Sequence, residues 1–414
     1  MALLSLIVLC ITLIIAFVFK ANSGLVAIAV SLILSWIADV PGSFLISSFN
    51  NSLFLMLLGV MYLFSIAQEN KTLELLSKKT FALCRGNVKA LPVVIFVVSA
   101  VISAIGPGLI SVSALVSVLI IALAQEMDIQ PIRLVPFGLL GAFGGGLTPI
   151  TPTGIVAINV AGENGITGIE GSLPWKMALT CIVYAAVLYF FVFKWHKEKR
   201  IPMEQTSTET TPSFSPKQIA TLAGIVVVAV VSSVFNINVG LISFAVAVVL
   251  TLFKVADEGA ALKKVPWNTL VMITGVGILI SLVTKLGGID LLSDGLSKLS
   301  TAKTVAPVMA LLSGVMSWVS SASGVVMPTL IPTIPDMVTA LPGANALTLV
   351  NCISIGANMA AMSPLSSCGA LMLAAYSSSG NPSAKDRNKM FLQLFILSAC
   401  GVALGGLLAL VGAY

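Results

Sequence analysis

The residues of this sequence that could bind a ligand are uncharged: Gly, Pro, Ser and Thr gather at four places where they interrupt apolar stretches. Two interruptions lie in the first half of the chain, at 103–113 and 144–154, and two in the second half, at 317–324 and 363–369. A break in a helix frees backbone carbonyls, which together with hydroxyls form a neutral oxygen cage suited to a hard cation such as Na⁺. The helix N-terminus beyond a break offers a positive dipole end to an anion. The breaks therefore predict a site for an anion and Na⁺.

Each break supplies candidate ligands. For the substrate anion we expect contacts from Gly106, Pro107, Gly108, Thr151, Pro152, Thr153, Ser321, Ser323, Ser366 and Ser367. For Na⁺ we expect them from Ser103, Gly106, Ser111, Thr148, Gly154, Ser320, Ser323, Ser363 and Gly369. The alternative is that such residues only allow close packing and kinks, as they do in many membrane helices. The pairing of the four breaks by an internal repeat, described next, favours a binding site.

The elements that must position these residues come from two similar halves of the chain. A shift of 216 residues places Gly24-Leu25 on Gly240-Leu241, and a shift of 215 places Thr148-Pro149 on Ser363-Pro364. Matches between apolar residues alone would be common by chance. An ordered series that includes Gly, Pro and hydroxyl residues at a nearly constant offset indicates an internal repeat.

The repeat divides the chain into a unit over 1–194, a polar linker over 195–216 and a second unit over 217–414. Each unit has the pattern of three spans, a re-entrant hairpin, an interrupted span and a final span, so we expect five crossings per unit. An odd number of crossings inverts the second unit, as in secondary transporters. The expected fold is an all-α integral membrane protein of two inverted-topology repeats, each with a re-entrant hairpin and an unwound helix.

The composition supports a multi-pass membrane protein. Of the 414 residues 57% are hydrophobic and only 9% are charged, whereas soluble proteins have about 25% charged residues. With a cytoplasmic linker, the inside loops hold 18 basic residues and the outside loops 4, as the positive-inside rule requires. Both termini are then expected outside. The net charge of +6 is read as this loop bias, so the expected partner is the lipid bilayer and not nucleic acid.

Charged residues are missing from the interiors of the expected spans. Proton-coupled carriers usually bury an ionisable group, so their absence favours Na⁺ coupling. No acid–base pair, metal-ligand cluster or nucleophile–His arrangement points to an enzyme, and the six cysteines have no metal-ligand spacing. The segments 69–89 and 285–303 mix charges with Leu at helical spacing, and are either interfacial helices or arms that link a static part to a mobile part.

At the paired hairpins and the Thr-Pro and Ser-Pro breaks, the whole chain resembles the ion-transporter superfamily, specifically the divalent anion–sodium symporter group and its malonate/dicarboxylate carrier relatives. The resemblance implies a homodimer in the bacterial cytoplasmic (inner) membrane that imports a small carboxylate, a C3–C6 dicarboxylate such as malonate or succinate, by Na⁺ symport. It also implies a scaffold domain and a transport domain that moves like an elevator. The hairpin tips here lack the Ser-Asn-Thr typical of the symporter group, which points to the malonate-carrier branch or a divergent relative.

Other functions remain open from the residues alone. The large membrane subunit of a TRAP-type carrier shares hairpins and repeats, but it requires a small membrane subunit and a binding protein. An H⁺-coupled or other anion transporter of the same superfamily is a second alternative. A channel or a membrane-embedded enzyme is a third; the missing catalytic cluster argues against the enzyme, and paired hairpins argue against a simple channel.

Overall fold

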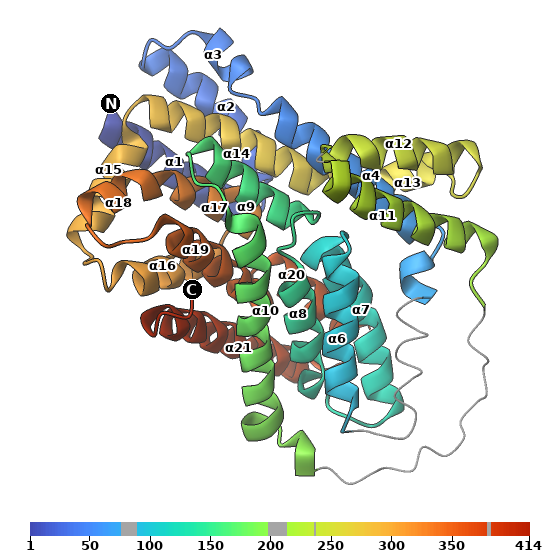
Figure 1. Ribbon diagram of the computed structural model, residues 1–414. Coiled ribbons are helices and arrows are strands. Elements are labelled where there is room, and N and C mark those ends of the chain that lie inside the picture. The colour runs from blue at the N-terminus through green and yellow to red at the C-terminus, as the bar shows by residue number, and fades with distance from the viewer. Residues whose placement is uncertain (76–88, 198–212, 236, 379–381) are drawn as a thin grey trace.

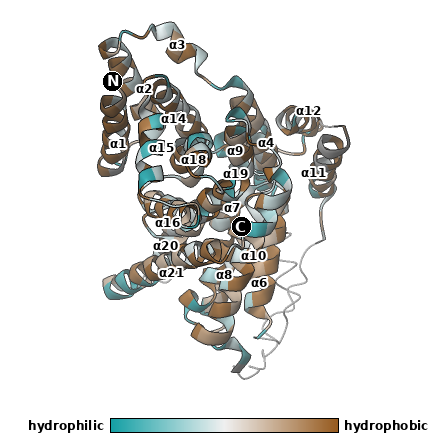
Figure 2. Cartoon of the chain, turned by 60° about the vertical axis from the view of Figure 1, so that its left-hand side comes forward, coloured by the Kyte–Doolittle hydropathy of each residue, from teal (hydrophilic) through white to brown (hydrophobic). Residues whose placement is uncertain are grey.

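A computed structural model describes residues 1–75, 89–197, 213–235, 237–378 and 382–414. Every regular element in these ranges is a helix, which confirms the expected all-α fold. Within these ranges six helices are long and apolar enough to cross a membrane, and a bent helix pair would make a seventh. Much of the length of the helices consists of hydrophobic residues, coloured brown in Figure 2. Most of the predicted linker and most of the predicted 69–89 segment lie outside the described residues.

The helices follow one order in both halves. The first half has α1 (Ala2–Val18), α2 (Ser23–Ile37), α3 (Gly42–Ser47), α4 (Asn51–Glu69), α6 (Leu91–Ala104), α7 (Gly108–Glu126), α8 (Val135–Gly145), α9 (Pro152–Glu163) and α10 (Ile169–Val187). The second has α11 (Pro216–Phe235), α12 (Val239–Leu252), α13 (Glu258–Lys264), α14 (Trp267–Lys285), α15 (Gly288–Lys298), α16 (Val305–Trp318), α17 (Met327–Leu330), α18 (Ile334–Ala340), α19 (Ala346–Met359), α20 (Ser367–Ser378) and α21 (Ala384–Leu410). The repeat and the inversion of one unit relative to the membrane stay predictions.

Two glycine crossings join the halves. Helix α2 packs on α14 and α12 packs on α4 (Figure 1). A Cβ atom on Gly275 would lie 2.4 Å from the carbonyl oxygen of Gly24, and one on Gly59 would lie 2.2 Å from that of Gly240. Only glycine permits such an approach of two backbones. The second helix of each half is therefore held by the third span of the other half.

Asparagine caps fix the start of α2 and α12 in the same way. The side-chain oxygen of Asn22 accepts from the backbone N–H of Gly24 at 2.9 Å. That of Asn238 accepts from the N–H of Gly240, also at 2.9 Å. Each cap satisfies a donor that a helix N-terminus would otherwise leave free. Gly24 and Gly240 therefore lie in the first turn of α2 and α12, directly after the caps.

A second group of helices packs beside the crossings. Helix α8 lies against α6, α7 and α10, and α19 lies against α16 and α21 (Figure 1). Here too glycine allows close approach: a Cβ on Gly141 would be 2.2 Å from the carbonyl oxygen of Phe96, and one on Gly356 would be 2.1 Å from that of Ala310. The interrupted helices of both halves are thus anchored on the first arms of the hairpins.

Helices end at each of the four predicted interruptions. Helices α6 and α7 form a hairpin that turns at residues 105–107, and α16 ends before a bend of 119° into 322–340. Helix α8 ends at Gly145 before α9, and α19 is followed by a 3-10 turn and a break before α20. The expected 285–303 segment contains α15, which packs on α1 and α18.

Candidate functional site

A pocket of about 530 Å³, counting the part open to solvent, lies at the tip of the α6–α7 hairpin. Five segments that are distant in sequence line it. They contribute Met61, Phe64, Ser65 and Gln68 of α4; residues 106–111; Pro152 and Thr153 at the start of α9; and Pro266, Thr269 and Ser323 from the second half.

The tip of the first hairpin depends on two glycines. Gly106 has φ 136° and Gly108 has φ 74°, conformations that other residues rarely adopt. A Cβ on Gly106 would lie 2.1 Å from the ring of Phe64, and one on Gly108 would lie 3.0 Å from Pro152 Cδ. The tip is therefore wedged between α4 and the start of α9, with Pro107 between the two glycines.

Two helix N-termini meet at the pocket. Helix α7 begins at Gly108 and α9 begins at Pro152, and both residues are part of the lining. The first N–H groups of a helix have no intrahelical partner and carry the positive end of the helix dipole. Among the described residues that line the pocket, none is charged. The arrangement suits an anion held by neutral donors and dipoles.

Thr151 is placed just behind this surface. It is fully buried, and its hydroxyl accepts from the N–H of Gly154 at 3.2 Å as the N-cap of α9. The same oxygen lies 2.8 Å from the carbonyls of Gly146 and Thr148, to which it can donate. Thr151 is not in the pocket lining, so in this conformation it orients the N-terminus that its neighbours Pro152 and Thr153 present to the pocket.

The second half contributes less to the pocket than the sequence predicts. Ser323, which is 5% exposed, is the one residue of the second hairpin among the described residues of the lining. Ser321 instead caps the following π-helical turn, where its hydroxyl accepts from the N–H of Gly324 at 3.1 Å. Ser366 and Ser367 lie at the start of α20, outside the lining.

The predicted Na⁺ ligands are divided between the pocket and the breaks. Gly106, Ser111 and Ser323 line the pocket. The others lie outside its lining, namely Ser103, Thr148, Gly154, Ser320, Ser363 and Gly369.

Several of the Na⁺ candidates outside the pocket make structural hydrogen bonds. Ser103 donates to the carbonyl of Ala142 at 2.7 Å, and Thr148 donates to that of Ala104 at 2.8 Å. These bonds connect α8 and the 144–154 break that follows it to α6, the first arm of the hairpin. In the second half Ser320 donates to the carbonyl of Met316 at 2.6 Å.

The two break glycines fill equivalent positions. A Cβ on Gly154 would lie 2.0 Å from the carbonyl oxygen of Thr148, and one on Gly369 would lie 2.3 Å from that of Ser363. Each glycine therefore lets the first turn of a helix pack directly on the carbonyls of its break. The paired geometry is what the sequence repeat leads one to expect at these positions.

The wall formed by α4 and α14 was not predicted from the sequence. Met61, Phe64, Ser65 and Gln68 recur at helical spacing and so share one face of α4. Ser65 uses its hydroxyl to donate to the carbonyl of Met61 at 2.8 Å, whereas Gln68 brings an amide to the lining. The sequence did offer one sign of this wall. Ser65 is a polar residue within an apolar span, and the repeat aligns it with another serine, Ser281.

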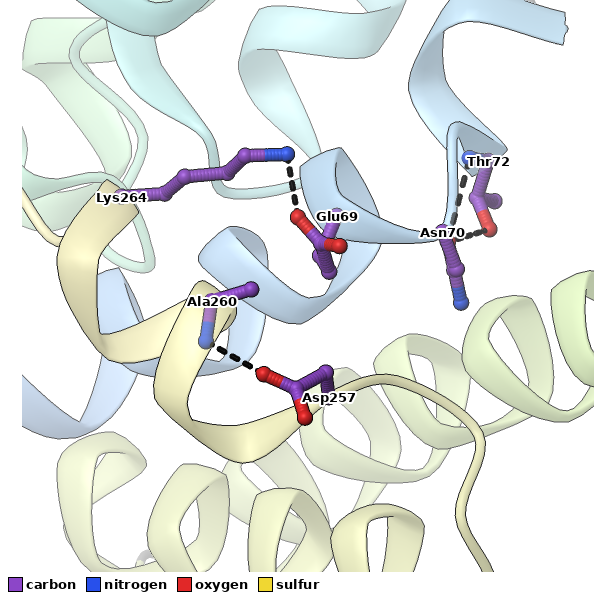
Figure 3. A network of polar contacts seen from close by, with 6 residues as sticks. All are labelled: Glu69, Asn70, Thr72, Asp257, Ala260 and Lys264. Atoms are coloured by element: carbon purple, nitrogen blue, oxygen red, sulfur yellow. Dashed lines mark hydrogen bonds and ion pairs between the residues drawn. The ribbon is translucent and has the colours of Figure 1, made fainter.

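An ion pair and a helix cap lie near this wall. Glu69, next to Gln68, forms an ion pair with Lys264 of α13 (Figure 3). In the same region Asp257 caps α13 by accepting from the N–H of Ala260 at 2.7 Å (Figure 3). Lys264 therefore has a carboxylate partner of its own.

Comparisons with known proteins agree with a transporter. Residues 11–356 match the family described as CitMHS, citrate transporter. The structure is similar to the crystal structure of the Alcanivorax borkumensis YdaH transporter, with a TM-score of 0.62 and 11% sequence identity. That match covers 89% of this chain and 86% of the YdaH chain, and at this identity it concerns the fold alone. No curated protein matches the sequence.

The fold and the comparisons define a multi-pass membrane transporter. Because the family match spans most of the sequence, the chain belongs to the citrate transporter family, within the ion transporter superfamily. Both the family and the structural neighbour are transporters and not enzymes, which confirms the expected class.

Proposed function

We propose that the protein imports a small carboxylate by Na⁺ symport, with the substrate bound in the pocket at the first hairpin tip. The observation that carries the proposal is the meeting of the α7 and α9 N-termini at a pocket without a charged lining residue among those described. An anion bound there would be met by dipoles and neutral donors. Because its charge would stay uncompensated by Arg or Lys, a co-bound Na⁺ is the natural counter-charge.

The substrate is proposed to have three to six carbons and at least two carboxylates. The family is named for citrate, and the resemblance of the whole chain to malonate/dicarboxylate carriers adds malonate and succinate. Citrate, malonate and succinate are therefore the compounds to compare.

An elevator movement fits the division of the pocket lining between two groups of helices. One wall belongs to α4 and α14, which are held together with α2 and α12 by the glycine crossings. The other wall is the hairpin tip, which joins α6 and α7, and the start of α9, a helix that contacts α7 and also α4 of the first wall. We propose that the first group is the static scaffold, through which two chains would form a homodimer, and that the second group moves.

The pocket lies near the end of α4 and the start of α14, at Gln68 and Pro266. Under the proposed topology both are on the cytoplasmic side of a bacterial inner membrane. The conformation is therefore assigned as inward-facing.

Uptake into proteoliposomes tests the function. The purified full-length chain, alone in the vesicles, should accumulate at least one labelled carboxylate when an inward Na⁺ gradient is imposed, and should continue when a protonophore is added. Uptake that ignores Na⁺ and stops with the protonophore would reassign the coupling to H⁺. No uptake by the chain alone, with uptake restored by a binding protein and a small membrane subunit, would identify a TRAP-type subunit.

A further inference from the structure

Helix α19 carries a buried polar face that the pocket does not use. Asn351, Ser354 and Asn358 are all fully buried, and their spacing of three and four residues places them on one side of the helix. The opposite side holds Gly356, which packs against the backbone of Ala310 in α16. The polar face is thus directed away from the first arm of the second hairpin.

The free atoms on this face are oxygens. The amide nitrogen of Asn351 donates to Ser172 Oγ of α10 at 3.4 Å, and that of Asn358 donates to the carbonyl of Ser354 at 2.7 Å. The two amide oxygens and Ser354 Oγ are buried without a hydrogen-bond partner in the described part of the chain. Some buried helical hydroxyls, such as that of Ser243, donate to the carbonyl four residues earlier, whereas those of Ser99 and Ser317 are single unpartnered groups on their helices. Three unpartnered acceptors on one buried face require an explanation.

Packing alone does not explain these residues, because the equivalent helix of the first half lacks them. Gly141 of α8 and Gly356 of α19 correspond in the repeat, and each lies against a carbonyl of a first hairpin arm. Counted from these glycines, the three polar positions of α19 correspond to Pro136, Leu139 and Phe143. All three are buried in α8. The same packing is therefore achieved with apolar side chains.

We propose that Ser354 Oγ and Asn358 Oδ1 bind a Na⁺ ion within the second half, with the Asn351 oxygen one turn away. Side chains four residues apart on a helix have Cβ atoms about 5–6 Å apart, close enough to share one ion. Neutral oxygens are ligands for a hard cation. Without a carboxylate, a divalent ion would remain uncompensated in this buried place, which favours a monovalent one.

The proposed ion would lie on a helix that also contacts the elements forming the transport site. Helix α19 contacts α9, α17 and the π-helical turn Ala322–Val326 that contains the pocket residue Ser323. In the described residues no group of three His, Cys, Asp or Glu side chains offers an alternative metal site. A role of this ion in transport rests on the proposed Na⁺ coupling. Its binding to α19 does not depend on that proposal.

Thermal unfolding of the purified protein in detergent, without any carboxylate, tests the binding. NaCl is titrated at constant ionic strength with choline chloride, and KCl is a parallel arm. The wild-type unfolding temperature should rise with Na⁺ and not equally with K⁺. In Ser354→Ala and Asn358→Leu the Na⁺ midpoint should move up at least about tenfold, since even indirect contacts to a metal are worth about 10–100-fold.

Two further variants separate an ion ligand from a structural side chain. Asn358→Asp keeps the oxygen and should retain the Na⁺ response. Ser313→Ala removes another fully buried serine, whose hydroxyl donates to the carbonyl of Ala310 at 3.0 Å, and should leave the Na⁺ midpoint unchanged. An unchanged midpoint in both Ser354→Ala and Asn358→Leu, or equal stabilisation by K⁺, would overturn the proposal and leave the face to ordered water. A Na⁺ response without carboxylate uptake would instead refute the proposed function.

Discussion

Gly106 is held by two independent constraints at the hairpin tip. Its φ of 136° is nearly restricted to glycine, and the ring of Phe64 occupies the space of a side chain. Phe64 belongs to α4, so the contact also sets the position of the tip relative to the proposed scaffold. A change at Gly106 therefore alters the pocket without removing any polar group.

We expect Gly106→Ala to reduce carboxylate uptake at least tenfold, because the backbone strain is of the order of 1–3 kcal/mol and the methyl group displaces Phe64. Gly162→Ala is the matched control. No atom lies within 4 Å of the Cβ it adds to α9, so uptake should be preserved. Initial uptake rates at equal reconstituted protein provide the measurement, and a fully active Gly106→Ala variant would argue against the tip as part of the site.

Thr153 brings a hydroxyl to the pocket at the first turn of α9. A hydrogen bond to a charged ligand contributes about 1.5–3 kcal/mol, so Thr153→Ala should weaken apparent substrate affinity about 10- to 100-fold. Ser117→Ala is the control, because that hydroxyl is bonded within α7 to the carbonyl of Ser113. The concentration dependence of uptake gives the apparent affinity of each variant. Equal apparent affinities for Thr153→Ala and Ser117→Ala would show that Thr153 does not contact the substrate.

The sequence predicted one side of this pocket and missed the other. Gly106, Gly108 and Thr153 stood out because breaks in apolar helices are visible as composition. Phe64 and Gln68 did not, because a helix interior gives no sign of which face meets a distant hairpin. That face is set by the angle at which α4 crosses its neighbours, a property of the assembled structure.

At the scale of elements, the glycine crossings decide how the halves pack. Gly275 and Gly277 both lie in α14, but only at Gly275 would a Cβ meet another backbone, at 2.4 Å from the carbonyl oxygen of Gly24. The repeat aligned Gly24 with Gly240 and Gly59 with Gly275. It could not reveal that the partners in space are Gly24 with Gly275 and Gly59 with Gly240, because each half completes the other's packing.

Gly275→Ala should therefore lower the unfolding temperature, since overpacking costs about 1–3 kcal/mol. Gly277→Ala adds a Cβ with no atom within 4 Å and should be neutral or stabilising, because alanine favours a helix interior over glycine by about 1 kcal/mol. Fluorescence-detected unfolding in detergent compares the two variants. Equal unfolding temperatures would mean that the crossing is not a tight contact.

At the scale of the whole molecule, the orientation in the membrane follows from the distribution of 18 inside and 4 outside basic residues. It predicts that Ser213, an exposed residue just before α11, is cytoplasmic. In a cysteine-free variant, Ser213→Cys in intact cells should react only with a membrane-permeant reagent. Rapid reaction with an impermeant reagent would reverse the topology, and with it the assignment of the conformation as inward-facing.

Substrate protection of the pocket is the most direct test of where transport takes place. Ser111 lines the pocket at the start of α7, and Ser111→Cys in a cysteine-free variant can be modified by a thiol reagent in proteoliposomes. A transported carboxylate together with Na⁺ should slow this modification several-fold, and either alone should slow it less. A modification rate unchanged by a carboxylate that the same variant still transports would place the substrate elsewhere and contradict the assignment of this pocket.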